Sequence, residues 1–233
     1  MRLIALDTAT ESVSAALLEG EELTVRLETE RNRHTERLLP LVDEVLKEKG
    51  LTAADLDAVA FGAGPGAFTG LRVACGVAQG LAWALEKPVV AVSNLQAAAL
   101  RARAAGAAGV VLIALDARMG ECYVGVYDLT DAMPRALTEP ELVKPEDAGE
   151  IAARHGCTVA AGSGLDLYAE KLGLAQTVKV ICGVSPDAGD IARIAVEMAS
   201  RGETTTAALA SPVYVRNRVA LTIEERARGE RLQ

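Results

Sequence analysis

The sequence predicts an α/β protein built from two tandem copies of one unit, whose elements follow the order strand, strand, strand, helix, strand, helix. Three observations predict this class. Residues 3–7 and 112–116 carry the same letters, Leu-Ile-Ala-Leu-Asp, at an offset of 109 positions. Residues 58–64 are echoed at 158–164, at an offset of 100 positions. The element order between the matching segments is also the same, which indicates an internal duplication.

The first copy is expected to contain four strands and two helices. The strands are expected at residues 2–7, 13–18, 23–27 and 58–61, and the helices at 34–49 and 70–85. A charged turn at 19–22 separates two of the strands, and apolar residues at three- and four-residue steps indicate the first helix. The glycine-rich residues 62–66 separate the last strand from the second helix, for which Thr69 is the expected N-cap.

The second copy is expected to repeat this order. Its strands are expected at residues 110–116, 122–129, 135–143 and 158–161, and its helices at 145–155 and 165–172. A further strand at 178–182, a helix at 187–200 and a basic tail complete the chain. The Ala/Gly-rich residues 104–109 indicate the boundary, which gives lobes of 1–106 and 107–233.

Composition argues against several classes of protein. Half of the 233 residues are hydrophobic, 3% are aromatic and the net charge is −8, which argues against a surface that grips phosphate backbones throughout. Any role near RNA is therefore expected to be indirect or confined to a local basic patch. No uncharged stretch approaches the ~20 apolar residues of a membrane span, and no leader is recognised, so a cytoplasmic protein is expected. The four cysteines form no C-x-x-C pair and are expected to be reduced and buried.

Each copy opens with a strand that delivers an aspartate, Asp7 or Asp116, to a loop. This pattern resembles the actin, Hsp70 and sugar-kinase superfamily, whose two loops face each other across a cleft and hold nucleotide phosphates and Mg²⁺. Phosphate loops need glycine because backbone N–H groups must approach the anion closely. Here Ala9 and Arg118 stand where members that use ATP typically have glycine. Asp7, Asp116 and Arg118 are therefore weak nucleotide-site candidates, for which loop capping is the simpler interpretation, and no cofactor is expected.

No catalytic set is recognised in the sequence. His34 and His155 are 121 positions apart and belong to no H-x-x-x-H pair, so a helix-borne metal site is not expected. No G-x-S-x-G elbow accompanies the serines. The histidine at position 34 more simply caps or borders the first helix.

The most distinctive segment is Gly-Ala-Gly-Pro-Gly-Ala-Phe-Thr-Gly-Leu-Arg at residues 62–72. It lacks the spacing and the lysine of a P-loop, so a tight strand-to-helix turn is favoured over an anion site. In the helix that follows, Gly76 and Gly80 lie four residues apart on one face. Each costs a helix about 0.5–1 kcal/mol relative to alanine. Such glycines indicate that another backbone packs unusually close, either within the chain or on a partner.

Motifs along nearly the whole chain resemble those of the TsaB family, also called YeaZ. They are Asp7-Thr8-Ala9-Thr10, Arg33-His34-Thr35-Glu36 with Leu38-Leu39-Pro40, Gly64-Pro65-Gly66-Ala67-Phe68-Thr69-Gly70-Leu71-Arg72, Asp116-Ala117-Arg118 with Gly120-Glu121 and Tyr123, and Pro212-Val213-Tyr214-Val215-Arg216. One departure is Ala67, where the family usually has serine. It removes a hydroxyl group and leaves the loop and helix intact.

The resemblance implies a noncatalytic scaffold subunit in making N6-threonylcarbamoyladenosine at position 37 of bacterial tRNAs. It also implies pairing with a TsaD-type transferase subunit, association with a TsaE-type ATPase, and homodimers when the partner is missing. The implied partner surface is formed by the first two helices of the N-terminal lobe. Its expected residues are His34, Leu38, Leu39, Val42, Leu46, Arg72, Cys75, Gly76, Gln79, Gly80 and Trp83.

Two other classes of function stay open. An ATP-dependent small-molecule kinase of the same superfamily predicts ATP binding at Asp7 and Asp116. A peptidase, an old label for relatives of the TsaB family, predicts cleavage that chelators or active-site reagents abolish. The basic tail is expected to be a solvated helix rather than a tRNA contact. Its arginines are Arg216, Arg218, Arg226, Arg228 and Arg231.

Overall fold

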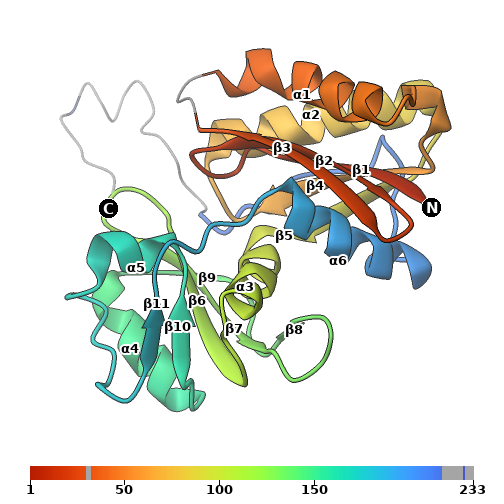
Figure 1. Cartoon of the computed structure of the whole chain (residues 1–233). Helices are drawn as coiled ribbons and strands as arrows, with labels where there is room; N and C mark the ends of the chain where they lie inside the picture. Colours follow the sequence, from red (N-terminus) through yellow and green to blue (C-terminus); the bar gives the residue numbers. More distant parts are fainter. Residues whose placement is uncertain (30–32, 217–227, 229–233) are drawn as a thin grey trace.

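Two sheets with the same strand order form the core of the chain, whose computed structural model describes residues 1–29, 33–216 and 228 (Figure 1). The first sheet has the order β3-β2-β1-β4-β5, from β1 (Arg2–Asp7), β2 (Val13–Glu19), β3 (Glu22–Glu28), β4 (Ala58–Gly64) and β5 (Val89–Ser93). The second has the order β11-β10-β6-β7-β8, from β6 (Val110–Asp116), β7 (Cys122–Asp128), β8 (Arg135–Ala136), β10 (Val159–Ala161) and β11 (Lys179–Ile181), with β9 (Glu141–Val143) also paired to β7. This repeated order confirms the duplicated, actin-like α/β class.

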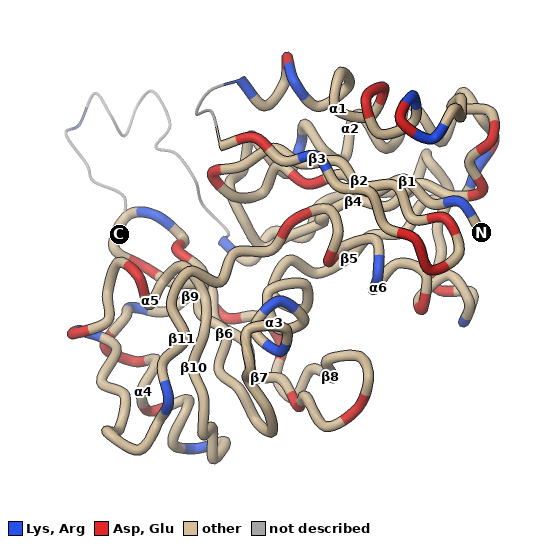
Figure 2. Tube along the Cα trace, viewed as in Figure 1, with Lys and Arg blue, Asp and Glu red and all other residues tan. Residues whose placement is uncertain are grey.

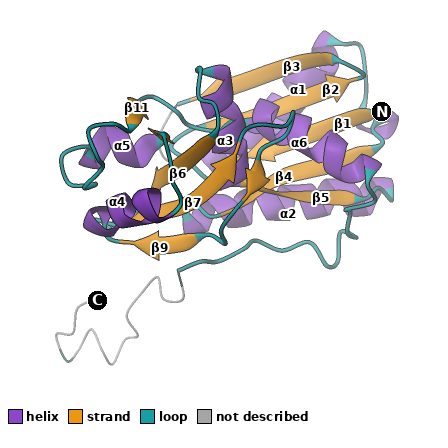
Figure 3. Ribbon diagram, turned by 90° about the horizontal axis from the view of Figure 1, so that it is seen from below, coloured by secondary structure: helices purple, strands orange, loops and turns teal. Residues whose placement is uncertain are grey.

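Helices cover both faces of each sheet (Figures 1 and 3). They are α1 (His34–Glu48), α2 (Phe68–Leu85), α3 (Asn94–Ala104), α4 (Pro145–Arg154), α5 (Ser163–Tyr168) and α6 (Ala188–Ser200), with a short 3₁₀ turn at Ala53–Asp55. On the first sheet, α1 and α2 pack on one face and α6 on the other. On the second, α3 packs on one face, and α4 and α5 on the other. The helix that follows the last strand of each copy, α3 after β5 and α6 after β11, therefore covers the sheet of the other copy.

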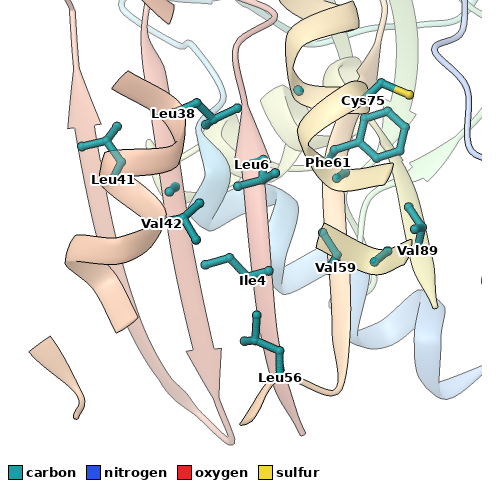
Figure 4. Packing of buried hydrophobic residues seen from close by; sticks show 14 of the residues in the cluster. Ile4, Leu6, Leu38, Leu41, Val42, Leu56, Val59, Phe61, Cys75 and Val89 are labelled. Carbon is teal, nitrogen blue, oxygen red and sulfur yellow. The ribbon is translucent and has the colours of Figure 1, made fainter. Parts of the chain in front are cut away.

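The core under α1 and α2 shows how the apolar periodicity of the sequence is used (Figure 4). Leu38 and Val42 of α1 pack in one buried cluster with Ile4 of β1. Phe61 of β4 and Cys75 of α2 belong to the same cluster. Burying a leucine, isoleucine or phenylalanine contributes roughly 1.5–3 kcal/mol each. The face of α1 that carries Leu38 and Val42 is therefore buried in the chain's own core.

The sequence prediction omits β5 and α3, which connect the two sheets. A signal for each is present in the sequence. Residues 89–92 form a short apolar run, and Ser93 then caps α3 by accepting a hydrogen bond from the Gln96 backbone N–H at 3.3 Å. Serine at an N-cap is a recognisable helix start, so this connection could have been predicted.

Two further local predictions are wrong. Thr69 is not the N-cap of α2, because the helix begins at Phe68 with Ala67 before it. The strand expected at 135–143 is interrupted and appears as β8 and β9. Pro140 lies just before β9, and a proline has no N–H to donate to a strand ladder.

Parts of the second half of the chain return to the first sheet. α6 packs against β1 and β2, and Thr205 pairs with Val89 at the edge strand β5. The lobe boundaries, 1–106 and 107–233, stay a prediction.

Residues 1–106 expressed alone are expected not to fold. Without α6, the face of the first sheet that carries Leu3, Ala5 and Ala16 is left open to solvent, and an exposed apolar face of this kind favours aggregation. Circular dichroism during heating tests this, and co-expression with residues 107–233 should restore a folded protein. A cooperative melting transition of the isolated fragment would contradict the expectation.

No helix among the described residues is both long and apolar enough to cross a membrane. In the basic tail, Arg218, Arg226 and Arg231 lie outside the described residues. Arg216, by contrast, binds the loop that follows β6.

Candidate functional site

A cleft of about 700 Å³ lies between the two sheets, bordered by the loops after β1 and β6, the start of α2 and residues 213–216. Its walls are largely apolar and include the exposed side chains of Leu27, Met119 and Leu167. Its polar lining residues include Thr10, Glu11, Ser12, Asp116, Arg118, Ser163, Asp166 and Arg216. The volume is in the range of small-molecule sites, so the chemistry of the two aspartate loops decides what the cleft fits.

Asp7 is not among the residues that line this cleft. It ends β1 fully buried, and its Oδ1 accepts a hydrogen bond from Asn94 Nδ2 at 2.7 Å. Its Oδ2 has no hydrogen-bond partner among the described residues. Burial raises the pKa of Asp7 to about 7, although the Asn94 hydrogen bond opposes the shift. The Asp7 carboxyl group is therefore enclosed beside Asn94 and is not presented to the cleft.

The loops that would cradle phosphate in an actin-like enzyme pack against each other here. A Cβ on Gly70 would lie 1.8 Å from Thr8 O, and a Cβ on Gly66 would lie 2.7 Å from Ala9 Cβ. Thr8 Oγ1 donates to Gly70 O at 2.6 Å. The backbone N–H of Ala67 donates to Ala9 O at 2.8 Å. These contacts occupy the Thr8 hydroxyl and the Ala67 N–H, two donors that a phosphate could otherwise bind.

Replacing Gly70 with alanine is expected to destabilise the fold by about 3 kcal/mol, because the new methyl group meets backbone that cannot turn away. The matched control is Gly76→Ala on the same helix, where the space is open. That control should raise stability by about 0.5–1 kcal/mol through helix propensity. Urea unfolding of both variants measures the difference, and equal stabilities would rule out the close approach of the two loops.

Asp116 and Arg118 do reach the cleft, but they bind each other and the opposite loop. Asp116 Oδ1 accepts hydrogen bonds from the Arg118 N–H at 2.9 Å and from the Tyr168 hydroxyl at 3.2 Å. The Arg118 guanidinium pairs with Asp116 Oδ2 at 3.4 Å, and with Glu11 Oε1 across the cleft at 2.8 Å. Two carboxylates thus compete with any phosphate for this arginine. Of the three weak candidates, the structure brings two together and leaves Asp7 apart.

The histidines and cysteines form no catalytic group within the described residues. His34 Nε2 lies 3.3 Å from the carbonyl oxygen of Glu11, and His155 follows the last turn of α4. No cluster of three His, Cys, Asp or Glu side chains that could hold a metal occurs in the described ranges. Burial raises the pKa of Cys122 to about 12 and that of Cys157 to about 11, which keeps both thiols protonated and unreactive.

Four residues of the expected partner surface lie in the chain's own core. Leu38, Val42, Leu46 and Cys75 are 5% exposed or less. The side chains of Leu38, Val42 and Leu46 are not available to a partner, which corrects the expectation for these three. Cys75 is also buried, but it borders a groove between α2 and residues 210–214. The helical periodicity that suggested them marks the stripe of each helix that faces the sheet.

The other seven expected residues lie at or near the surface. His34 and Gln79 are half-exposed, while Leu39, Arg72, Gly76, Gly80 and Trp83 are exposed. Trp83 is the sole tryptophan of the chain and is 72% exposed. A large aromatic side chain left in solvent is a feature of protein contact surfaces.

The exposed face of α2 differs from an ordinary surface helix. Arg72 is the one charged residue among the 18 of α2, whereas acidic and basic residues are interspersed along α1 (Figure 2). Within the described chain, nothing lies within 4 Å of a Cβ built on Gly76 or Gly80. No close neighbour inside the described chain therefore explains these two glycines, and the face they share is open.

A segment that follows α6, residues 205–216, runs alongside α2 toward the cleft and is called the strap (Figure 3). Gln79 Nε2 of α2 donates to Ala210 O at 2.8 Å. The strap and α2 border a groove of about 290 Å³. Sequence reasoning assigns the strap no structural role, because it forms neither a regular helix nor a regular strand.

Comparison with known proteins identifies the family. A family model described as "TsaD: tRNA N6-adenosine threonylcarbamoyltransferase" matches residues 28–210. In Escherichia coli (strain K12), the "tRNA threonylcarbamoyladenosine biosynthesis protein TsaB" is 38% identical over 224 residues, covering 94% of this chain and 96% of that protein. The chain belongs to the TsaB family.

Solved structures agree with membership of the TsaB family. One is a crystal structure of an uncharacterized protein with similarity to peptidase YEAZ from Pseudomonas aeruginosa, with a TM-score of 0.85 and 40% identity over 92% of this chain and 99% of that one. Another, "YeaZ from Pseudomonas aeruginosa", has a TM-score of 0.83 and 40% identity over 91% of this chain and 99% of that one. The likeness spans both copies of the repeated unit, so the whole duplicated body is the TsaB-family fold.

Proposed function

We propose that this chain is a noncatalytic scaffold subunit in the synthesis of N6-threonylcarbamoyladenosine at position 37 of bacterial tRNA. It binds a TsaD-type transferase subunit through the exposed face of α1 and α2. Its membership of the TsaB family supports a place in this pathway. Its net charge of −8 supports contact with tRNA that is indirect.

The observation that carries the proposal is the open glycine face of α2. Gly76 and Gly80 each cost the helix about 0.5–1 kcal/mol, and no residue of the described chain packs close to either. A partner helix that approaches this face closely would gain contacts that a side chain at either position would block. Leu39 and Trp83 are exposed apolar residues of the same two helices, and tryptophan is among the residue types that contribute most to binding.

The match to the transferase family supports the identity of the partner. Because the model of that family covers residues 28–210, the chain and a TsaD-type subunit are expected to share a fold. Two chains of similar fold can pair through equivalent helices about an approximate twofold axis. A second copy of this chain can then occupy the same face when the partner is missing, which gives a homodimer. A TsaE-type ATPase is proposed to join the assembled pair.

The contacts around the cleft support a noncatalytic role for this chain. Asp7 is enclosed, and the loop around Gly70 is packed against the loop after β1. Arg118 is paired with two carboxylates. The reaction is therefore assigned to the partner subunit, and this chain supplies the surface on which the partner is held.

Modification of tRNA by purified TsaD-type and TsaE-type subunits, measured with and without this chain, tests the proposal. Threonylcarbamoyl transfer is expected only when the chain is present, and the chain alone should turn over nothing. Full transfer in its absence would contradict the scaffold role. Calorimetry with Mg-ATP is the control for the kinase alternative, because tight binding by the isolated chain would favour that class.

A further inference from the structure

The strap connects two places that are otherwise separate, the face of α2 and the cleft. On α2, Gln79 Nε2 donates to Ala210 O at 2.8 Å, and Arg72 Nε donates to the Tyr214 hydroxyl at 3.1 Å. The Arg72 guanidinium lies 3.9 Å from the centroid of the Phe68 ring. The rings of Phe68 and Tyr214 are 5.4 Å apart, centroid to centroid. Two residues of the proposed partner surface, Arg72 and Gln79, thus hold the strap.

Two residues beyond Tyr214, the strap binds the loop after β6, residues 116–121. The Arg216 guanidinium donates to Ala117 O at 2.9 Å and pairs with Glu121 at 2.6 Å. The side chain of Arg216 is 10% exposed and that of Glu121 is 26% exposed. Shielding from solvent makes such a pair more consequential than an ordinary surface ion pair.

The loop that Arg216 binds has an uncommon backbone conformation. Arg118 and Met119 have φ values of 62° and 58°, and Gly120 follows with a φ of 78°. The left-handed region is unfavourable for residues with a side chain, and two such residues in succession persist only where their surroundings fix them. The contacts that fix it include Arg216 and the Asp116 carboxylate, which accepts the Arg118 N–H, together with backbone hydrogen bonds from the Ala117 N–H to Glu121 O at 2.9 Å and from the Glu121 N–H to Arg118 O at 3.1 Å. Withdrawing Arg216 removes the contact that reaches the loop from the strap, so the loop then depends on its own hydrogen bonds.

The groove beside α2 has one wall from each element. The α2 wall consists of Arg72, Cys75, Gly76 and Gln79. The strap wall consists of Ala210, Ser211, Pro212 and Tyr214. A partner side chain seated in this groove contacts both walls at once. The contacts with the strap wall form only while the strap lies against α2. The partner therefore binds this conformation more tightly than one in which the strap has moved away.

We propose that the strap couples the partner-binding face to the cleft, so that a partner bound on α2 holds the strap and fixes loop 116–121 in its left-handed conformation. The coupling rests on the proposed function. The fixed loop keeps Arg118 paired with Glu11 across the cleft at 2.8 Å. By linkage, partner binding and the fixed loop conformation stabilise each other by the same factor. A change that releases the loop therefore weakens partner binding by that factor.

The variant Glu121→Gln tests the coupling away from the partner surface, because it removes the charge that holds Arg216 without altering α2. Its dissociation constant for the TsaD-type subunit, measured by calorimetry, is expected to rise about five- to tenfold. The matched control is Glu150→Gln, which removes a 76%-exposed carboxylate from a surface pair on α4. That control should bind as the wild type does.

Hydrogen exchange on the wild-type complex supplies the second measurement. The N–H of Ala117 donates to Glu121 O at 2.9 Å within the loop, and its exchange should slow about fivefold or more when the TsaD-type subunit saturates α2. Because no variant is involved, this measurement decides even where Glu121→Gln folds poorly. Unchanged exchange overturns the coupling, and so does a folded Glu121→Gln that binds as tightly as the control. Absence of any binding to the wild-type chain is a different outcome and overturns the proposed function as well.

Discussion

Replacing Gly76 with leucine is expected to weaken binding of the TsaD-type subunit by about 5- to 150-fold, while the free chain becomes no less stable. Overpacking a close helix contact costs about 1–3 kcal/mol, which gives that loss of affinity. In the free chain the Cβ atom of the new side chain meets open space. Removing a helix-interior glycine there adds about 0.5–1 kcal/mol of stability. Opposite effects on folding and on binding separate an interface from a core position.

Calorimetric titration with the partner and urea unfolding of the free chain measure the two effects of Gly76→Leu. The control is Ala153→Leu, which adds a leucine to an exposed helical position on α4, in the other half of the chain. The control should leave partner affinity unchanged. Wild-type affinity in Gly76→Leu would remove α2 from the interface, and a large loss of stability would show that the position is packed in the free chain.

Replacing Asp7 with asparagine is expected to stabilise the protein by roughly 4 kcal/mol at pH 8 and by little at pH 4. Burial raises the pKa of Asp7 from 3.8 to about 7 in the folded chain. Between these values the folded state binds the proton more tightly than the unfolded state. The free energy of unfolding therefore falls as pH rises through this window, by about 1.4 kcal/mol for each pH unit. The amide removes the charge, and its oxygen can still accept the hydrogen bond from Asn94 Nδ2.

Urea unfolding of the wild type and Asp7→Asn at pH 4, 6 and 8 measures this difference. Asp131→Asn is the control, because that aspartate is exposed in a loop and its substitution should not change the pH dependence. A gap between wild type and Asp7→Asn that does not widen with pH would show that Asp7 is not held neutral. A less stable Asp7→Asn at pH 8 would show that the ionised carboxylate has a partner.

The fold class could be predicted from sequence because the repeated letters belong to equivalent strands. Residues 3–7 and 112–116 lie in β1 and β6, which occupy the same place in the two sheets. Strands buried on both faces read as continuous apolar runs, which makes their repetition easy to see. α3 is harder to recognise because it lies between the sheets. Ala97 packs in the core of the first sheet and Ala98 in that of the second, so α3 has no single apolar stripe.

The partner surface could be predicted only in part, because sequence identifies apolar helices but not which side of each meets the sheet. Leu38 and Leu39 are neighbours in the chain, yet the first is 0% exposed and the second 51%. The sequence alone shows that Gly76 and Gly80 are unusual, because both lie in the interior of an expected helix. That no part of the described chain approaches either glycine is visible only in the structure.

The two aspartates also look equivalent in sequence, and the structure separates them. Asp116 reaches the cleft, while Asp7 is enclosed with Asn94. Asn94 is the first residue of α3, an element that the sequence prediction omits. Without that helix in place, nothing in the letters around Asp7 indicates that its carboxyl group is buried.

The environment of Trp83 when the TsaD-type subunit is added tests most directly whether α2 is the docking face. The chain has one tryptophan, so fluorotryptophan incorporated into this chain alone gives a single ¹⁹F resonance, which comes from the proposed docking face. We expect this resonance to shift and to lose its solvent sensitivity on binding, and we expect Gly76→Leu to prevent the change at the same concentrations. Complex formation by light scattering, with the Trp83 resonance unmoved, would contradict it.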